Sequence, residues 1–222
     1  MNPPRVILFD WDDTLVDNFV CIHAALNAAL TAMGHQQWTF AEFQAWRGPS
    51  VRDLFPQMFG NRAGEARRIF YAAFEAGHLK TLKALPGARE MLAALHQAGL
   101  VLGVVSNKIG HYLRREVAHL EWSGYFHRLV GAMDAARDKP AAEPVWLALE
   151  GMGVPPGDDV WFVGDSLTDM KCAYNAGCCP VLLRLRPPDE EEFTRFRPSC
   201  YFSHCNAIIR AVYELLIPKS RF

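Results

Sequence analysis

Five short apolar runs recur along the sequence, and none of them alternates with polar residues. A continuous apolar run is typical of a strand in a parallel sheet that is covered on both faces. Helix-like stretches separate the runs, which is the βαβ rhythm of an α/β fold. A weaker sixth strand is expected near residues 199–203. We therefore predict a doubly wound parallel sheet built from the strands VILFD (6–10), LVLGVVS (100–106), RLVGAM (128–133), DVWFVGD (159–165) and CPVLLRL (179–185).

The interval between the first two runs is far longer than one crossover needs, and it reads as several helices. One helical segment is closed by Gly34, and the next is opened by a capping box formed by Thr39 and Glu42. We expect residues 17–84 to form an inserted helical domain. Residues 1–16 and 85–222 would then form the core domain around the sheet.

The charge balance of the chain argues against nucleic acid and anionic membranes as partners. The 23 Lys and Arg residues face 24 Asp and Glu residues, so no basic excess favours a nucleic acid or an anionic membrane. No apolar stretch approaches the roughly 18 residues of a membrane span.

The six cysteines lack C-x-x-C spacing and the start MNPPRV has no apolar leader, which favours a reduced, cytoplasmic setting. We expect Cys172, Cys178 and Cys179 to be core residues, and either a monomer or a homodimer is compatible with the sequence.

Polar side chains follow the predicted strands at their carboxyl ends, where ligands bind in open α/β sheets. Carboxylates brought together there repel one another unless a cation lies among them, so Asp10 with Asp165 implies a bound metal. Oxygen-only ligands favour Mg²⁺. In strand order, the candidate residues are Asp10, Asp12 and Thr14; Ser106 and Asn107; Lys139; and Asp165 with Asp169.

The same residues suggest a reaction. Asp10 and Asp12 are two residues apart, so an extended chain turns both to one side, where one can attack and the other can shuttle a proton. Ser106, Asn107 and Lys139 supply hydroxyl, amide and ammonium donors that, with Mg²⁺, would cradle a dianionic phosphoryl group. The predicted substrate is therefore a phosphate ester.

The stretch GDSLTDM (164–170) contributes two further carboxylates. Gly164 permits a tight turn from strand to helix, and we expect Asp165 and Asp169, four residues apart, to share one face of that helix. One of them would bind the metal and the other would orient its waters.

Taken together, these residues resemble the four short motifs of the haloacid dehalogenase superfamily of phosphohydrolases, in the family's order. The match covers the Asp-x-Asp-x-Thr motif with Asp10, Asp12 and Thr14, the second motif with Ser106, the third with Lys139 in DKPAAEP, and the fourth with Asp165 and Asp169.

This resemblance implies that Asp10 attacks phosphorus to form an aspartyl-phosphate, and that Asp12 protonates the leaving oxygen and then activates water. Mg²⁺ would be held by Asp10, the backbone carbonyl of Asp12 and Asp165. Asp12 also argues against a dehalogenase, because the dehalogenating members lack an acid there. The insert at 17–84 looks like the family's small helical cap, as in phosphoglycolate phosphatase and β-phosphoglucomutase.

The chain departs from the family's pattern at a few places. Asp13 stands where many relatives carry Gly, and Trp11 replaces a common aliphatic residue. Lys108 is a rival to Lys139, and the family's pattern would place it in the helix start after Ser106. Arg47, in a polar break between helices of the insert, is a candidate ligand for a substrate anion.

We predict a Mg²⁺-dependent phosphomonoesterase that acts on a small phosphorylated metabolite and is most similar to a phosphoglycolate phosphatase. A phosphosugar mutase that uses the same two aspartates but returns the phosphoryl group to sugar is the nearest alternative. A receiver domain of signalling proteins is an alternative of another class, although its acid pair follows the first strand, whereas GDSLTD comes late here.

Overall fold

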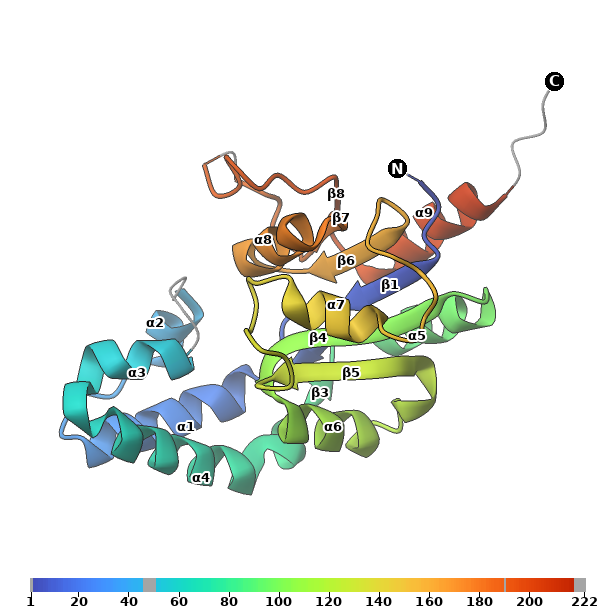
Figure 1. Cartoon of the computed structure of the whole chain (residues 1–222). Helices are drawn as coiled ribbons and strands as arrows, with labels where there is room; N and C mark the ends of the chain where they lie inside the picture. The colour runs from blue at the N-terminus through green and yellow to red at the C-terminus, as the bar shows by residue number, and fades with distance from the viewer. Residues whose placement is uncertain (1, 46–50, 190, 218–222) are drawn as a thin grey trace. The chain divides into compact units, whose positions relative to one another are not determined.

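The computed structural model describes residues 2–45, 51–189 and 191–217 (Figure 1). The chain divides into two compact units, one of Met1–Val16 with Ala84–Phe222 and the other of Asp17–Lys83. It passes between them through β2 (Val16–Asp17) and β3 (Lys83–Ala84), which pair as a two-stranded sheet. None of the described helices is long and apolar enough to cross a membrane.

The larger unit is built on a six-stranded sheet whose neighbouring strands all pair in parallel. The predicted doubly wound sheet and its weaker sixth strand are confirmed. The strand order reverses beside β1, and such a switch point is where open α/β sheets bind ligands. Across the sheet the strands are β5 (Phe126–Ala132), β4 (Val101–Ile109), β1 (Val6–Phe9), β6 (Val160–Gly164), β7 (Cys179–Leu183) and β8 (Cys200–Phe202).

Both faces of the central strands are buried, which is why their sequences are apolar throughout. Leu8 of β1 and Phe162 of β6 share one core with α7 (Glu143–Leu149) and α8 (Leu167–Ala176). Their neighbours in the strands point the other way and are equally buried, as Phe9 shows at 0% exposure.

The opposite face is covered by the remaining helices of this unit. Right-handed crossovers from β1 to β4 and from β4 to β5 place α5 (Ala88–Gln97) and α6 (Gly110–His119) there. The last helix, α9 (Cys205–Leu216), packs against α5. The predicted core cysteines are buried, and the six cysteines of the chain form no disulfide.

The smaller unit is helical and has its own packed interior. An aromatic row runs along its longest helix, where Phe74 stacks on Phe70 at 6.1 Å and on His78 at 5.0 Å between ring centroids. The capping box is confirmed, because the Glu42 carboxylate accepts from the Thr39 amide at 2.7 Å and the Thr39 hydroxyl accepts from the Glu42 amide at 3.2 Å. Its helices are α1 (Phe19–Ala32), α2 (Phe40–Ala45), α3 (Val51–Phe59), the 3₁₀ turn η1 (Gly60–Arg62) and α4 (Ala63–Thr81), with α1 packed against α4.

Candidate active site

The segment after β1 is held in a tight turn. The Asp10 amide donates to the Val163 carbonyl at 2.8 Å, which carries the pairing of β1 with β6 one residue beyond the strand. Asp13 has a φ of 64°, in the left-handed region. Glycine adopts that region without steric cost, and Asp tolerates it better than most residues do, so Asp13 is compatible with this turn.

Strand β4 is longer than predicted because it contains a bulge. Val105 pairs with Val130 and Ile109 pairs with Ala132, so residues 106–108 of β4 face a single residue of β5. A bulge bends a strand and redirects its side chains. The prediction that the strand ends at residue 106 and that Lys108 lies at the start of a helix is therefore wrong, since α6 begins only at residue 110.

The turn from β6 into α8 places the two later carboxylates differently from the prediction. Ser166 is the N-cap of α8, so Asp165 precedes the helix and does not share a helix face with Asp169. The Asp169 carboxylate closes a capping box, accepting from the Ser166 amide at 3.0 Å and from its hydroxyl at 2.6 Å. A Cβ on Gly164 would lie 2.4 Å from the Asp169 Cβ, so only glycine allows this close approach.

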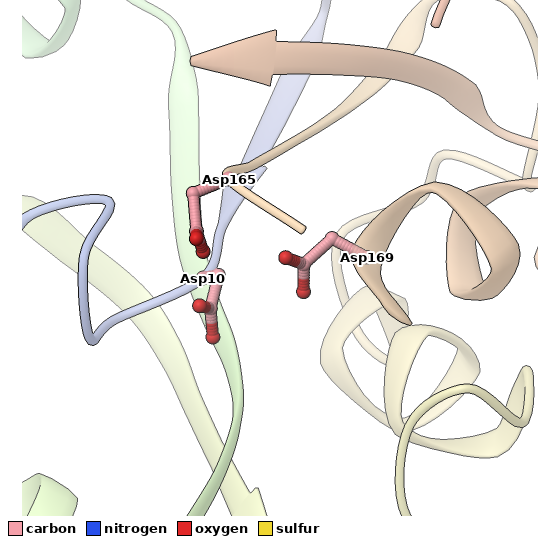
Figure 2. Close-up of side chains that lie close together, drawn as sticks. All are labelled: Asp10, Asp165 and Asp169. Carbon is pink, nitrogen blue, oxygen red and sulfur yellow. The ribbon is translucent and has the colours of Figure 1, made fainter. Parts of the chain in front are cut away.

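Three carboxylates nevertheless converge at the switch point. Oxygen atoms of Asp10, Asp165 and Asp169 lie within 4.8 Å of one another, and Figure 2 shows the three side chains close together. Burial raises the pKa of Asp10 to about 7, with Lys139 opposing the rise and Asp169 adding to it. Burial, followed by repulsion from Asp169 and Asp10, also raises the pKa of Asp165 well above its usual range. An oxygen-only set with excess negative charge fits a hard divalent cation.

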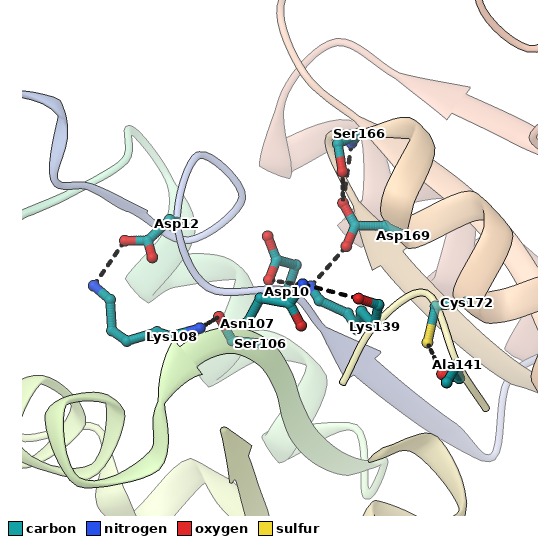
Figure 3. Close-up of polar contacts among 10 residues, drawn as sticks. All are labelled: Asp10, Asp12, Ser106, Asn107, Lys108, Lys139, Ala141, Ser166, Asp169 and Cys172. Atoms are coloured by element: carbon teal, nitrogen blue, oxygen red, sulfur yellow. Dashed lines mark hydrogen bonds and ion pairs between the residues drawn. The ribbon is translucent and has the colours of Figure 1, made fainter. Parts of the chain in front are cut away.

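Lys139 lies inside this cluster. Its Nζ donates to Oδ1 of Asp10 at 2.5 Å and to Oδ1 of Asp169 at 2.7 Å. Burial disfavours the ammonium, but the two carboxylates outweigh it and hold the pKa of Lys139 above its usual value. The side-chain amide Nδ2 of Asn107 donates to the backbone carbonyl of Lys139 at 3.0 Å, so this contact joins the β4 bulge to the segment that carries Lys139 (Figure 3).

Lys108, the rival lysine, binds the other aspartate of the first motif. Its Nζ donates to Oδ1 of Asp12 at 2.8 Å, and its amide donates to the Ser106 hydroxyl at 3.2 Å (Figure 3). The two lysines are therefore not alternatives for one place. The Asp12 side chain is not in the three-carboxylate cluster, and its expected metal contact through the backbone carbonyl stays a prediction.

Two further candidates, Thr14 and Arg47, are predicted to bind substrate anions. Thr14 is 1% exposed, and its hydroxyl has no hydrogen-bond partner among the described residues. Its role in phosphate binding stays a prediction. Arg47 lies outside the described residues, so its expected contact with a substrate anion also stays a prediction.

Sequence reasoning missed Glu116, a buried residue that contacts Lys108 and Trp11 beside the candidate site. Glu116 of α6 is fully buried and accepts from Lys108 Nζ at 2.6 Å and from the Trp11 indole at 2.7 Å. A signal was present, since Glu116 lies one helical turn after the buried Tyr112 and Leu113, on the face that the helix turns to the core. A carboxylate at such a position needs a buried partner.

Comparison with known proteins gives a consistent result. Residues 7–182 match a family model described as haloacid dehalogenase-like hydrolase. The chain is 28% identical to a phosphoglycolate phosphatase from Pseudomonas fluorescens, over 95% of this chain and 80% of the relative. It is 31% identical to one from Aquifex aeolicus, over 88% of this chain and 93% of the relative. A predicted phosphatase from Clostridium acetobutylicum shares the fold at a TM-score of 0.83, with 20% identity over 96% of this chain and 99% of its own.

Proposed function

The chain belongs to the haloacid dehalogenase-like hydrolase family, and from this premise we propose that it hydrolyses a small phosphate monoester of the phosphoglycolate type. The observation that carries the proposal is the convergence of Asp10, Asp165 and Asp169 around Lys139 at the carboxyl ends of the strands. The likeness to phosphoglycolate phosphatases supports the choice of substrate class.

In the proposed mechanism the Asp10 carboxylate attacks phosphorus, and the bond from phosphorus to the leaving oxygen breaks. Asp12 gives a proton to that oxygen, so the alcohol leaves and an aspartyl-phosphate remains. Asp12, now a carboxylate, takes a proton from water, and that water attacks phosphorus. Inorganic phosphate leaves and Asp10 is restored.

The surrounding residues have supporting roles. Lys139 orients the Asp10 carboxylate through their 2.5 Å contact and offers positive charge to the phosphoryl oxygens. Ser106 and the second amide proton of Asn107 are proposed donors to the same oxygens. Mg²⁺, held by Asp10 and Asp165 with Asp169 beside them, would neutralise phosphoryl charge when bound.

We further propose that the helical unit, Asp17–Lys83, is a cap that selects the substrate. The family resemblance and the separate packed interior of this unit support that role. Arg47 remains the candidate within it for binding a second anionic group of the substrate.

The test is phosphate release from a panel of phosphorylated metabolites, including phosphoglycolate and hexose phosphates, with Mg²⁺ present. We expect release from wild type and a loss of at least about 10⁴-fold in Asp10→Asn, because the nucleophile is gone. Asp12→Asn should block protonation of the leaving group or hydrolysis of the intermediate, and Asp165→Asn should chiefly weaken Mg²⁺ binding.

Three other outcomes would contradict parts of the proposal. Comparable activity in Asp10→Asn would refute the nucleophile. Interconversion of sugar phosphates that needs a bisphosphate activator would indicate a mutase. An aspartyl-phosphate that persists for minutes without turnover would indicate a receiver domain.

A further inference from the structure

The buried carboxylate of Glu116 has one partner in the segment after β1, Trp11, and another at the end of β4, Lys108. Glu116 is 0% exposed, and a carboxylate in that environment is costly unless it is paired. One of its oxygens, Oε2, accepts from the Lys108 ammonium at 2.6 Å and from the Trp11 indole at 2.7 Å. These charge-assisted contacts anchor Glu116, which itself lies on the rigid helix α6.

The Trp11 contact fixes the backbone between the two aspartates of the first motif. The Trp11 side chain is fully buried and packs edge-on against Trp122, with 5.8 Å between ring centroids. Its carbonyl accepts from the Leu15 and Val16 amides at 2.9 Å and 3.1 Å. The side-chain and backbone contacts of Trp11 therefore hold in place the residue that directly precedes Asp12.

The Lys108 contact reaches the Asp12 side chain itself. Lys108 Nζ lies 2.8 Å from Oδ1 of Asp12 and 2.6 Å from Oε2 of Glu116, and its side chain is only 5% exposed. The Asp12 side chain is 27% exposed, so solvent alone would leave it several rotamers. An ammonium fixed by a second, buried carboxylate selects one of them.

We propose that Lys108 and Glu116 are positioning residues for Asp12: Glu116 holds the Lys108 ammonium, and Lys108 holds the Asp12 carboxylate in the orientation that transfers protons to and from substrate. The proposal rests on the proposed function, in which Asp12 is the acid and base. It also gives Trp11 a role, because the indole is the large apolar side chain that offers Glu116 an N–H donor.

The test compares two substrates that differ in their need for an acid. Phosphoglycolate has a poor leaving group that must be protonated, whereas p-nitrophenyl phosphate has a leaving group that departs without a proton. In Glu116→Gln we expect kcat/KM for phosphoglycolate to fall about 100-fold, the size expected for a misplaced group, while nitrophenolate release in the first turnover changes less than about threefold.

The second half of the reaction gives an independent readout. Since Asp12 also activates water, Glu116→Gln should accumulate aspartyl-phosphate and show a burst of nitrophenolate followed by a slower steady rate. Asp12→Asn is the reference for that pattern. A merely structural effect would slow both substrates together and produce no burst.

Matched variants keep the test decisive. Arg114→Met removes another ion pair of α6, between Arg114 and Asp134 at 2.8 Å, and should leave both substrates within about twofold of wild type. Lys108→Met alone leaves the Glu116 carboxylate buried without its ammonium. The double variant Lys108→Met with Glu116→Gln is therefore also measured, because Gln at position 116 carries no charge. It should reproduce the burst.

The outcomes separate the two proposals. Failure of wild type to release phosphate, or equal activity in Asp10→Asn, overturns the proposed function and this inference with it. If wild type is active and Asp12→Asn shows the burst, but neither Glu116→Gln nor the double variant does, the positioning role is wrong and the proposed function stands.

Discussion

Two buried lysines each bridge a pair of carboxylates, yet the charge around them differs. Lys139 contacts Asp10 and Asp169, and Asp165 lies within 4.8 Å of both, so the ionised cluster keeps two negative charges. Lys108 contacts Asp12 and Glu116, and a neutral indole supplies a further donor to Glu116. The first cluster has the excess charge that a divalent cation balances, whereas the second has the donors that fix a side chain.

Removal of each lysine should give the largest effects and should separate the clusters. Lys139→Met leaves the buried Asp10 and Asp169 without their ammonium, and Lys108→Met leaves the buried Glu116 without its own, so each should lower the free energy of unfolding by about 3–5 kcal/mol without metal. Mg²⁺ should restore part of the loss in Lys139→Met and none in Lys108→Met. Urea unfolding at pH 8 in EDTA and in Mg²⁺ measures the free energy that Mg²⁺ restores to each variant. Equal recovery of stability in both variants would contradict the claim that only the Lys139 cluster binds the cation.

A methyl group at Gly164 should act on the first cluster alone. The added Cβ would lie 2.4 Å from the Asp169 Cβ, so Gly164→Ala must displace that carboxylate or the strand. We expect a loss of about 1–3 kcal/mol in stability and weaker Mg²⁺ binding by calorimetry. Gly124→Ala is the control, because its Cβ would meet nothing within 4 Å. A Gly164→Ala protein that matches this control would contradict the packing described for Asp169.

The pH dependence of stability should report the excess charge. The pKa of Asp10 is raised from 3.8 to about 7 in the folded chain, so between these values the folded state holds a proton that the unfolded chain has lost. Stability without metal should therefore fall as pH rises through this window, by about 2–4 °C in Tm for each 1 kcal/mol.

Mg²⁺ competes with the same protons, so its stabilising effect should be larger at pH 8 than at pH 5. Thermal unfolding across that range with EDTA or Mg²⁺ provides the measurement. A Mg²⁺ effect that does not change with pH would show that these carboxylates do not hold the ion.

The smallest expected effect comes from Asp13. Its charge contributes to the raised pKa of Asp165, and its φ of 64° is one that Asn also tolerates. Asp13→Asn should raise stability at pH 8 without metal by less than about 1 kcal/mol. Asp13→Ala loses the same charge but tolerates the backbone poorly, so it should be less stable than Asp13→Asn in the same unfolding assay. The reverse order would contradict the left-handed turn.

The sheet was predictable from sequence because its strands are buried on both faces and are apolar throughout. The carboxyl-terminal end of β4 was not predictable. Ser106, Asn107 and Lys108 have the composition of a loop, and they belong to the strand only because a bulge lets them pair alongside β5. Local spacing also misplaced Asp165, because Ser166 caps α8 and starts the helix one residue later.

The candidate site also has a part that the sequence predicted and a part that it did not. The aspartates that follow β1 and β6 could be read from the strand ends, because their positions follow from the sheet. Glu116 could not be paired with Lys108 in advance, since the contact depends on how α6 packs behind the first motif. Its place among the buried residues of α6 shows only that some partner was needed.

The pairing of β2 with β3 brings the two ends of the helical insert together. The Leu85 amide donates to the Leu15 carbonyl at 2.9 Å, so the chain resumes the core beside the point where it left it. An insert joined at neighbouring points behaves as an exchangeable module. A short hairpin loop could therefore replace residues 18–82 and still join β2 to β3, which would give the core unit as a separate chain for folding studies.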